Sequence, residues 1–161
     1  MEMFCYQCEQ TAKGKGCDIA GVCGKDPVTA GLQDLLLHAA KGLAFYGHRL
    51  GAMGRRDHDR DHALVEALFT TVTNVNFDAD GVEARLRAMT GLRDRARDEY
   101  EALCRERKVT PDVGGPAATF VPATDRAELL RQAGQVMVTE RKKGLGEDIT
   151  GLQELCLYGL K

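Results

Sequence analysis

The sequence predicts an all-α protein, in which a cysteine-rich loop precedes a three-helix bundle and the start of a second bundle follows. Three observations support this fold class. Apolar residues recur at helical spacing in three long segments, one stretch of the first segment returns at the end of the chain, and four of the six cysteines lie within residues 4–25. Only residues 135–140 have strand character, and a single short run cannot form a sheet.

Residues 1–27 form the cysteine-rich leader, which ends at the sequence GKDP. Asp26 can cap a helix there, and Pro27 fits the first helical turn because that position does not use the missing N–H. A helix is therefore expected from about Val28. Its apolar residues alternate in steps of four and three and form one stripe: Leu32, Leu36, Ala39, Leu43, Tyr46, Leu50 and Met53.

Two further helices complete a bundle over residues 28–108. One is expected over residues 59–73, with the side chains of Leu64, Leu68 and Val72 on one face. The other begins after a cap at Asp78 or Asp80 and extends to about residue 107, and its stripe contains Val82, Leu86, Met89, Ala96, Tyr100 and Leu103. Three helices with short connections predict a three-helix bundle.

Residues 109–147 are predicted to be a linker with one short helix at about residues 125–133. The sequence VTPDVGGPAATFVP at its start holds three of the four prolines and a glycine pair. Such a composition is typical of linkers and surface loops.

An internal repeat connects the two ends of the chain. GLQDLLLHAAK at residues 31–41 returns as GLQELCLYGLK at residues 151–161, with six identities in eleven positions. Residues 148–161 are therefore expected to form the beginning of the first helix of a second bundle. The whole chain is then expected to be the front part of a longer protein. The repeat aligns Cys156 with Leu36, which predicts that Cys156 is a small buried hydrophobe; Cys104 is expected to be structural or partly exposed.

The four leader cysteines are the candidate metal ligands. Cys5, Cys8, Cys17 and Cys23 make the pattern C-x2-C-x8-C-x5-C. A C-x2-C pair directs two thiolates at one ion, and two more complete a tetrahedral or cubane shell. Structural zinc sites usually have a second close pair, so the irregular spacing favours an iron–sulfur cluster, with structural zinc and disulfides as the alternatives.

Other function classes find little support in the sequence. A net charge of −2 and the absence of Trp argue against a nucleic-acid partner, and no apolar run approaches the roughly 20 residues of a membrane-spanning helix. No secretory signal is recognisable, which predicts a cytoplasmic location. No catalytic residue is assigned, because no known catalytic motif occurs, and His58 and His62 fit a solvated helix start.

The sequences MFCYQCEQTAKGKGCDIAGVCGKDP and LQDLLLHAAKGLAFYG closely resemble the N-terminus of the hybrid-cluster proteins, also called prismane proteins or hydroxylamine reductases. The likeness continues through LFTTVTNVNFD to the second copy of the repeat. The resemblance implies that Cys5, Cys8, Cys17 and Cys23 bind a [4Fe–4S] cubane. It also implies an electron-transfer part of an oxidoreductase that reduces hydroxylamine or nitric oxide, whose hybrid iron–sulfur–oxygen centre is held by later domains.

These expectations define the partners and a competing hypothesis. A redox donor protein and the remaining domains of the parent protein are the expected partners, with further association through the helix of residues 148–161. This part of the chain is expected to be inactive without the hybrid centre. The competing hypothesis is a helical scaffold or interaction domain, stabilised by zinc at the leader and without redox function.

Overall fold

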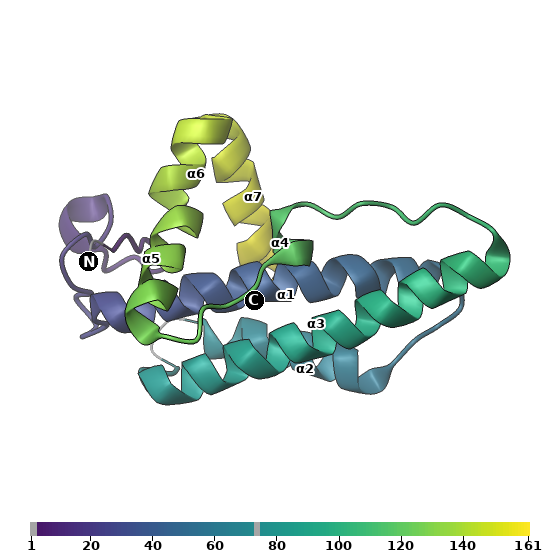
Figure 1. The fold of residues 1–161 in the computed structure, drawn as a ribbon. Helices are drawn as coiled ribbons and strands as arrows, with labels where there is room; N and C mark the ends of the chain where they lie inside the picture. The colour runs from purple at the N-terminus through teal and green to yellow at the C-terminus, as the bar shows by residue number, and fades with distance from the viewer. Residues whose placement is uncertain (1–2, 73–74) are drawn as a thin grey trace.

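The computed structural model describes residues 3–72 and 75–161 of the chain (Figure 1). Within these ranges the chain forms helices and no strand, and the only β-type pairing is an isolated antiparallel bridge between Cys5 and Cys17. The predicted all-α class is confirmed. None of the described helices has both the length and the apolar character needed to cross a membrane.

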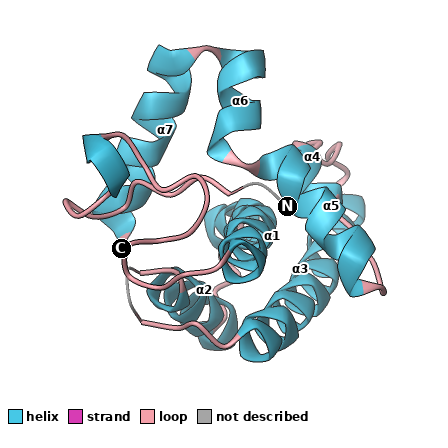
Figure 2. Cartoon of the chain, turned by 90° about the vertical axis from the view of Figure 1, so that its left-hand side faces the viewer, coloured by secondary structure: helices cyan, strands magenta, loops and turns pink. Residues whose placement is uncertain are grey.

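Helix α1 (Pro27–Ala52) lies at the centre of the molecule, as the end-on view in Figure 2 shows. Its start agrees with the prediction, since the Asp26 side chain accepts a hydrogen bond of 2.6 Å from the Thr29 N–H and Pro27 occupies the first turn. The predicted stripe from Leu32 to Leu50 is buried. Met53 lies just beyond the helix end and is partly buried.

Helices α2 (His58–Thr70) and α3 (Ala79–Arg107) pack against α1 and complete the predicted bundle. On α3 the whole predicted stripe is buried: Val82, Leu86, Met89, Ala96, Tyr100 and Leu103. Asp78 caps α3 as expected, because its side chain accepts a hydrogen bond from the Asp80 N–H. Helix α2 ends at Thr70, so Val72 of the predicted stripe lies outside it. The fully buried apolar side chain of this helix is Ala67.

The segment predicted as a linker with one short helix differs from that expectation. It contains α4 (Pro116–Thr119), α5 (Arg126–Val136) and α6 (Val138–Leu145). Ala118, Leu129 and Ala133 from α4 and α5 are fully buried against α1. Residues 109–115 are irregular as their composition predicts, but α4 and α5 supply apolar residues to the core, which composition alone did not reveal.

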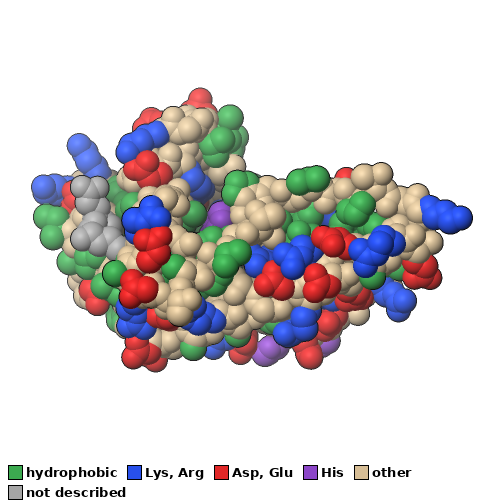
Figure 3. All heavy atoms as spheres, viewed as in Figure 1, with side chains coloured by type: hydrophobic (Ala, Val, Ile, Leu, Met, Phe, Trp, Pro, Cys, Tyr) green, Lys and Arg blue, Asp and Glu red, His purple; other side chains and the backbone are tan. Residues whose placement is uncertain are grey.

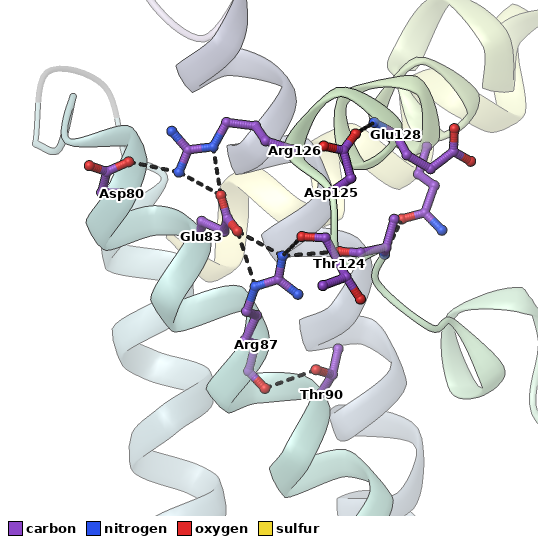
Figure 4. A network of polar contacts seen from close by, with 10 residues as sticks. Asp80, Glu83, Arg87, Thr90, Thr124, Asp125, Arg126 and Glu128 are labelled. Carbon is purple, nitrogen blue, oxygen red and sulfur yellow. Dashed lines mark hydrogen bonds and ion pairs between the residues drawn. The ribbon is translucent and has the colours of Figure 1, made fainter.

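A network of charged side chains attaches the start of α5 to α3 (Figure 4). Glu83 on α3 accepts hydrogen bonds of 2.7 Å from both Arg87 and Arg126. Arg87 also donates to the carbonyl oxygens of Ala123 and Thr124, at 3.0 and 3.1 Å. The Arg87 hydrogen bond holds the pKa of the Glu83 carboxyl below its usual value.

Helix α7 (Glu147–Leu160) pairs with α6, and the two project together from α1 in Figures 1 and 2. Its start agrees with the predicted start near Asp148. The predicted burial of Cys156 is wrong, because this residue is exposed. Its neighbours Leu152 and Leu160 are 64% and 70% exposed, and Figure 3 shows hydrophobic side chains on this projection.

The exposure of Cys156 has a simple physical cause. Its repeat equivalent, Leu36, is fully buried among the helices of the bundle. Among the described helices only α6 packs extensively on α7, so the corresponding face stays open. An apolar groove of about 580 Å³ results, with α1, α2 and α7 as its walls. Cys104, by contrast, is buried, with 1% of its surface exposed.

Candidate metal site

The leader is folded back on itself by two of its cysteines. The Cys5 N–H donates to the Cys17 carbonyl oxygen at 3.0 Å, and the Cys17 N–H donates to the Cys5 carbonyl oxygen at 2.7 Å. Gly16 permits this close pairing, since a Cβ atom there would lie 2.6 Å from the Phe4 ring. The first and third predicted ligands are therefore adjacent on paired backbone.

Tight turns carry the loops between the cysteines. A turn of 3-10 helix, η1 (Ala12–Gly14), separates Cys8 from Cys17, and the Ala12 N–H points at the Cys17 sulfur over 3.5 Å. Before Cys23, Gly21 donates to the Lys25 carbonyl oxygen at 2.8 Å. A Cβ atom on Gly21 would lie 3.0 Å from the Cys23 sulfur, so a larger residue at this position would push the neighbouring atoms by a few tenths of an ångström.

The four leader thiols are free of disulfides, and one of them is more buried than the other three. Cys17 is buried, and Cys5, Cys8 and Cys23 are half-buried. The structure does not turn them toward one centre: within residues 3–72 and 75–161, no three Cys, His, Asp or Glu side chains together form a group that could hold a metal ion. The donor set thus fits a four-thiolate site in number and chemistry, while its shell is not preassembled.

Lysine and glutamine side chains attach the end of the leader to the bundle. Lys25, which is 3% exposed, donates from Nζ to the Gln33 side-chain oxygen at 2.6 Å. Gln33 in turn donates to the Asn76 carbonyl oxygen at 2.8 Å. A buried cation two residues after Cys23 is thereby fixed against α1.

The leader also covers a small cavity of about 40 Å³ that is lined by charged and polar side chains. The leader, α1, α6 and α7 all contribute to its wall. Its polar lining residues are Cys5, Tyr6, Gln7, Asp34, His38, Lys41, Arg141, Glu154 and Tyr158. Arg141 on α6 is the centre of this group, because it donates to the carboxylate of Glu154 and, at 3.2 Å, to the side-chain oxygen of Gln153.

Burial changes the acid–base behaviour of two α1 residues at this cavity. It raises the pKa of Asp34 to about 7; the positive charge of Arg141 opposes this shift and the negative charge of Glu154 reinforces it. Burial also lowers the pKa of His38 to about 4, with the nearby Lys41 charge adding to the effect. The folded structure therefore favours the neutral form of both side chains.

Sequence reasoning did not identify this group of charged side chains beside the leader. The available signal was the repeat, which aligns Asp34 with Glu154 and His38 with Tyr158. The structure brings both copies to one cavity, beside the first leader cysteine. His58 and His62, by contrast, are exposed on α2, with their rings stacked at 6.2 Å.

Tyr158 of α7 and Lys161, the residue directly after this helix, reach the turn between the first two cysteines. The Tyr158 ring meets the Tyr6 ring edge-on, with 6.0 Å between ring centres. The Gln7 side-chain amide lies between Lys161 and the Thr71 carbonyl oxygen at the end of α2. In the orientation that satisfies both, Gln7 donates to Thr71 at 3.0 Å and accepts from Lys161 Nζ at 3.2 Å.

Comparison with known proteins agrees with the resemblance seen in the sequence. The model of a family described as the Prismane/CO dehydrogenase family matches residues 3–161. The chain belongs to this family. Among similar Prismane-family relatives, a hydroxylamine reductase of Rhodospirillum rubrum is 45% identical over 159 residues, which is 99% of this chain. Hydroxylamine reductases of Acidiphilium cryptum and Burkholderia lata are 46% and 49% identical over 164 residues, again 99% of the chain.

The match covers a limited part of these Prismane-family relatives. The chain spans 29% of the length of each of the three hydroxylamine reductases. Membership of the family thus extends over the leader, the bundle and the α6–α7 projection together.

Proposed function

We propose that this chain is the [4Fe–4S]-binding, electron-transfer part of an oxidoreductase of the hydroxylamine reductase type. The observation that carries the proposal is the leader, in which four free thiols at C-x2-C-x8-C-x5-C spacing lie on a loop folded back at Cys5 and Cys17. Membership of the Prismane family and the names of its relatives support the reaction type.

Cys5, Cys8, Cys17 and Cys23 would hold the cluster as thiolates. When bound, the cluster would supply one-electron transfer. The Ala12 N–H, 3.5 Å from the Cys17 sulfur, would stabilise negative charge there. Phe4 and Tyr6, with rings 5.2 Å apart beside Cys5, would limit access of water.

The unassembled shell is compatible with this assignment. Metal sites often form only as the metal binds, since ligand binding energy contributes to folding. Gly21 brings the backbone close to the Cys23 sulfur, and none of the four leader cysteines is in a disulfide. Loading is therefore expected to draw the four thiols together.

The substrate-reducing centre is proposed to lie outside this chain. A cubane with a thiolate on each iron has no open position for hydroxylamine or nitric oxide. Electrons would reach the leader from a redox donor protein in the cytoplasm and pass to a hybrid centre held by the remaining domains. Those domains are the proposed occupants of the apolar groove beside α7, whose leucines are exposed here.

Metal analysis of anaerobically purified protein tests the proposal. About four irons and four sulfides per chain are expected, with an EPR signal after reduction. Cys8→Ser should lose most of the iron, whereas the matched variant Cys156→Ser, at an exposed cysteine outside the leader, should keep it. A colourless protein with one zinc would instead support the zinc-stabilised scaffold, and full iron retention in Cys8→Ser would remove that residue from the ligand set.

A further inference from the structure

We infer that the C-terminal end of α7 holds the Cys5–Cys8 turn in place through Tyr158 and the cap residue Lys161. The inference rests on the proposed function in one respect: these two side chains are positioning residues for the cluster that this turn is proposed to bind. They are not ligands themselves. Both lie on the second copy of the internal repeat, far from the leader in sequence.

The turn has little support of its own. In the part of the chain that the structure describes, no backbone hydrogen bond involves Tyr6 or Gln7. Cys5 is fixed by its pairing with Cys17, and the Cys8 carbonyl oxygen accepts one long hydrogen bond of 3.4 Å from Thr11. The direction of the turn between the two cysteines therefore depends on what the side chains of Tyr6 and Gln7 contact.

Those contacts come from α7 and the end of α2. Tyr6 packs between Phe4 and Tyr158, with ring centres 5.2 and 6.0 Å from its own. Lys161 donates to the Gln7 side chain at 3.2 Å and to the Thr71 carbonyl oxygen at 3.4 Å. The C-terminal end of α7 thus engages both residues that separate Cys5 from Cys8.

The repeat shows that this contact is specific to α7. The α1 equivalent of Tyr158 is His38, whose ring meets Phe120 at 5.3 Å instead of the leader. Lys161 further stabilises the α7 end, because its Nζ lies 5.9 Å from the centre of the Tyr158 ring. The two copies of the repeat share a helical pattern. Their equivalent residues His38 and Tyr158 nevertheless contact different parts of the molecule.

Hydrogen exchange on the metal-free full chain tests the inference without any dependence on the cluster. The test variant is Tyr158→Ala/Lys161→Ala. The matched control is Leu155→Ala/Leu160→Ala, which truncates two exposed side chains of the same helix. Exchange of the Cys5 amide, which is the hydrogen-bonded amide within residues 4–9 and adjoins the turn, should rise about fivefold or more in the test variant only, while exchange in α3 stays unchanged.

Unchanged exchange of the Cys5 amide in the test variant would overturn the inference. An equal rise in the leucine control would also overturn it, because loss of helix stability would then explain the effect. The conservative variant Tyr158→Phe/Lys161→Arg keeps the ring and the charge, and should restore most of the protection.

Loaded protein gives a second readout that a merely structural role would not change. The EPR signal of the reduced protein should be altered in Tyr158→Ala/Lys161→Ala and unaltered in the leucine control, since ligand orientation tunes such clusters. A wild-type chain that binds no iron would contradict the proposed function. The exchange result would still show whether Tyr158 and Lys161 hold the Cys5–Cys8 turn. The two failures are therefore distinguishable.

Discussion

Asp34 and Glu154 occupy equivalent positions in the two copies of the repeat, and both line one cavity with Arg141. Their environments differ. Arg141 donates directly to Glu154, whereas it acts on Asp34 only as a nearby positive charge. The pKa of Asp34 rises to about 7 as a result of its burial, despite the nearby positive charges of Arg141, Lys25 and Lys161.

This difference predicts a pH dependence of stability. The folded pKa of Asp34 lies above its ordinary value of 3.8, so its contribution is full below that value and is lost as pH rises through about 7. The pKa of His38 falls from 6.5 to about 4, so its contribution is present above 6.5 and is lost as pH falls through about 4. The two effects oppose one another between these limits.

Single substitutions should separate the two contributions. Asp34→Asn should make stability rise with pH between about 5 and 6.5, and His38→Gln should make it fall between about 5 and 7; the wild type should show the shallowest slope. Urea unfolding midpoints at several pH values measure this. Identical profiles for Asp34→Asn and wild type would contradict the assignment.

The close approach of α4 to α1 predicts an unusual response to a glycine substitution. A Cβ atom on Gly42 would lie 2.1 Å from the Ala117 carbonyl oxygen, whereas one on Gly47 would meet nothing within 4 Å. Gly42→Ala should therefore destabilise by about 1–3 kcal/mol, despite the better helix propensity of alanine. Gly47→Ala in the same helix should stabilise by about 0.5–1 kcal/mol. Denaturant unfolding of both variants is the measurement, and equal effects would disprove the contact.

The network at Glu83 predicts a measurable loss on neutralisation. Glu83→Gln removes the charge that accepts from Arg87 and Arg126, and should cost about 1–2 kcal/mol of unfolding free energy. Glu106→Gln, at an exposed residue of the same helix, is the control and should change little. Because the pKa of Glu83 is lowered, the difference between Glu83→Gln and wild type should shrink as pH falls below the ordinary value of 4.5.

Thiol labelling should distinguish the two cysteines outside the leader. Cys156 is exposed and Cys104 is 1% exposed, so an alkylating reagent should modify Cys156 in the folded chain and leave Cys104 intact. Peptide mapping by mass spectrometry quantifies both sites. Comparable modification of Cys104 under native conditions would mean that the core around α3 opens readily.

Turnover experiments test where the substrate-reducing centre lies. The iron-loaded chain, supplied anaerobically with an artificial one-electron donor and hydroxylamine, is expected to release no sustained ammonia, because the proposed cluster with four thiolates would leave no iron open. A full-length relative serves as the positive control. Ammonia production at a comparable rate would place the active centre within these residues.

Much of this molecule could be predicted from local sequence. The Asp26–Pro27 start of α1, the apolar stripe of α3 and the helix near Asp148 agree with the structure, since caps and helical periodicity depend on residues only a few positions apart. The four leader cysteines could likewise be chosen as candidate ligands, because their spacing is a property of the sequence itself.

Tertiary structure alone decided the rest. Cys156 matches Leu36 in sequence yet is exposed, because burial depends on which helices pack on a face, and pattern cannot show that. Ala118 and Ala133 belong to the core although they lie in a segment rich in turn residues. Likewise, the meeting of Tyr6 with Tyr158 joins residues more than a hundred positions apart. Such contacts follow from how the helices pack in three dimensions, whereas a local pattern records only which side of each helix is apolar.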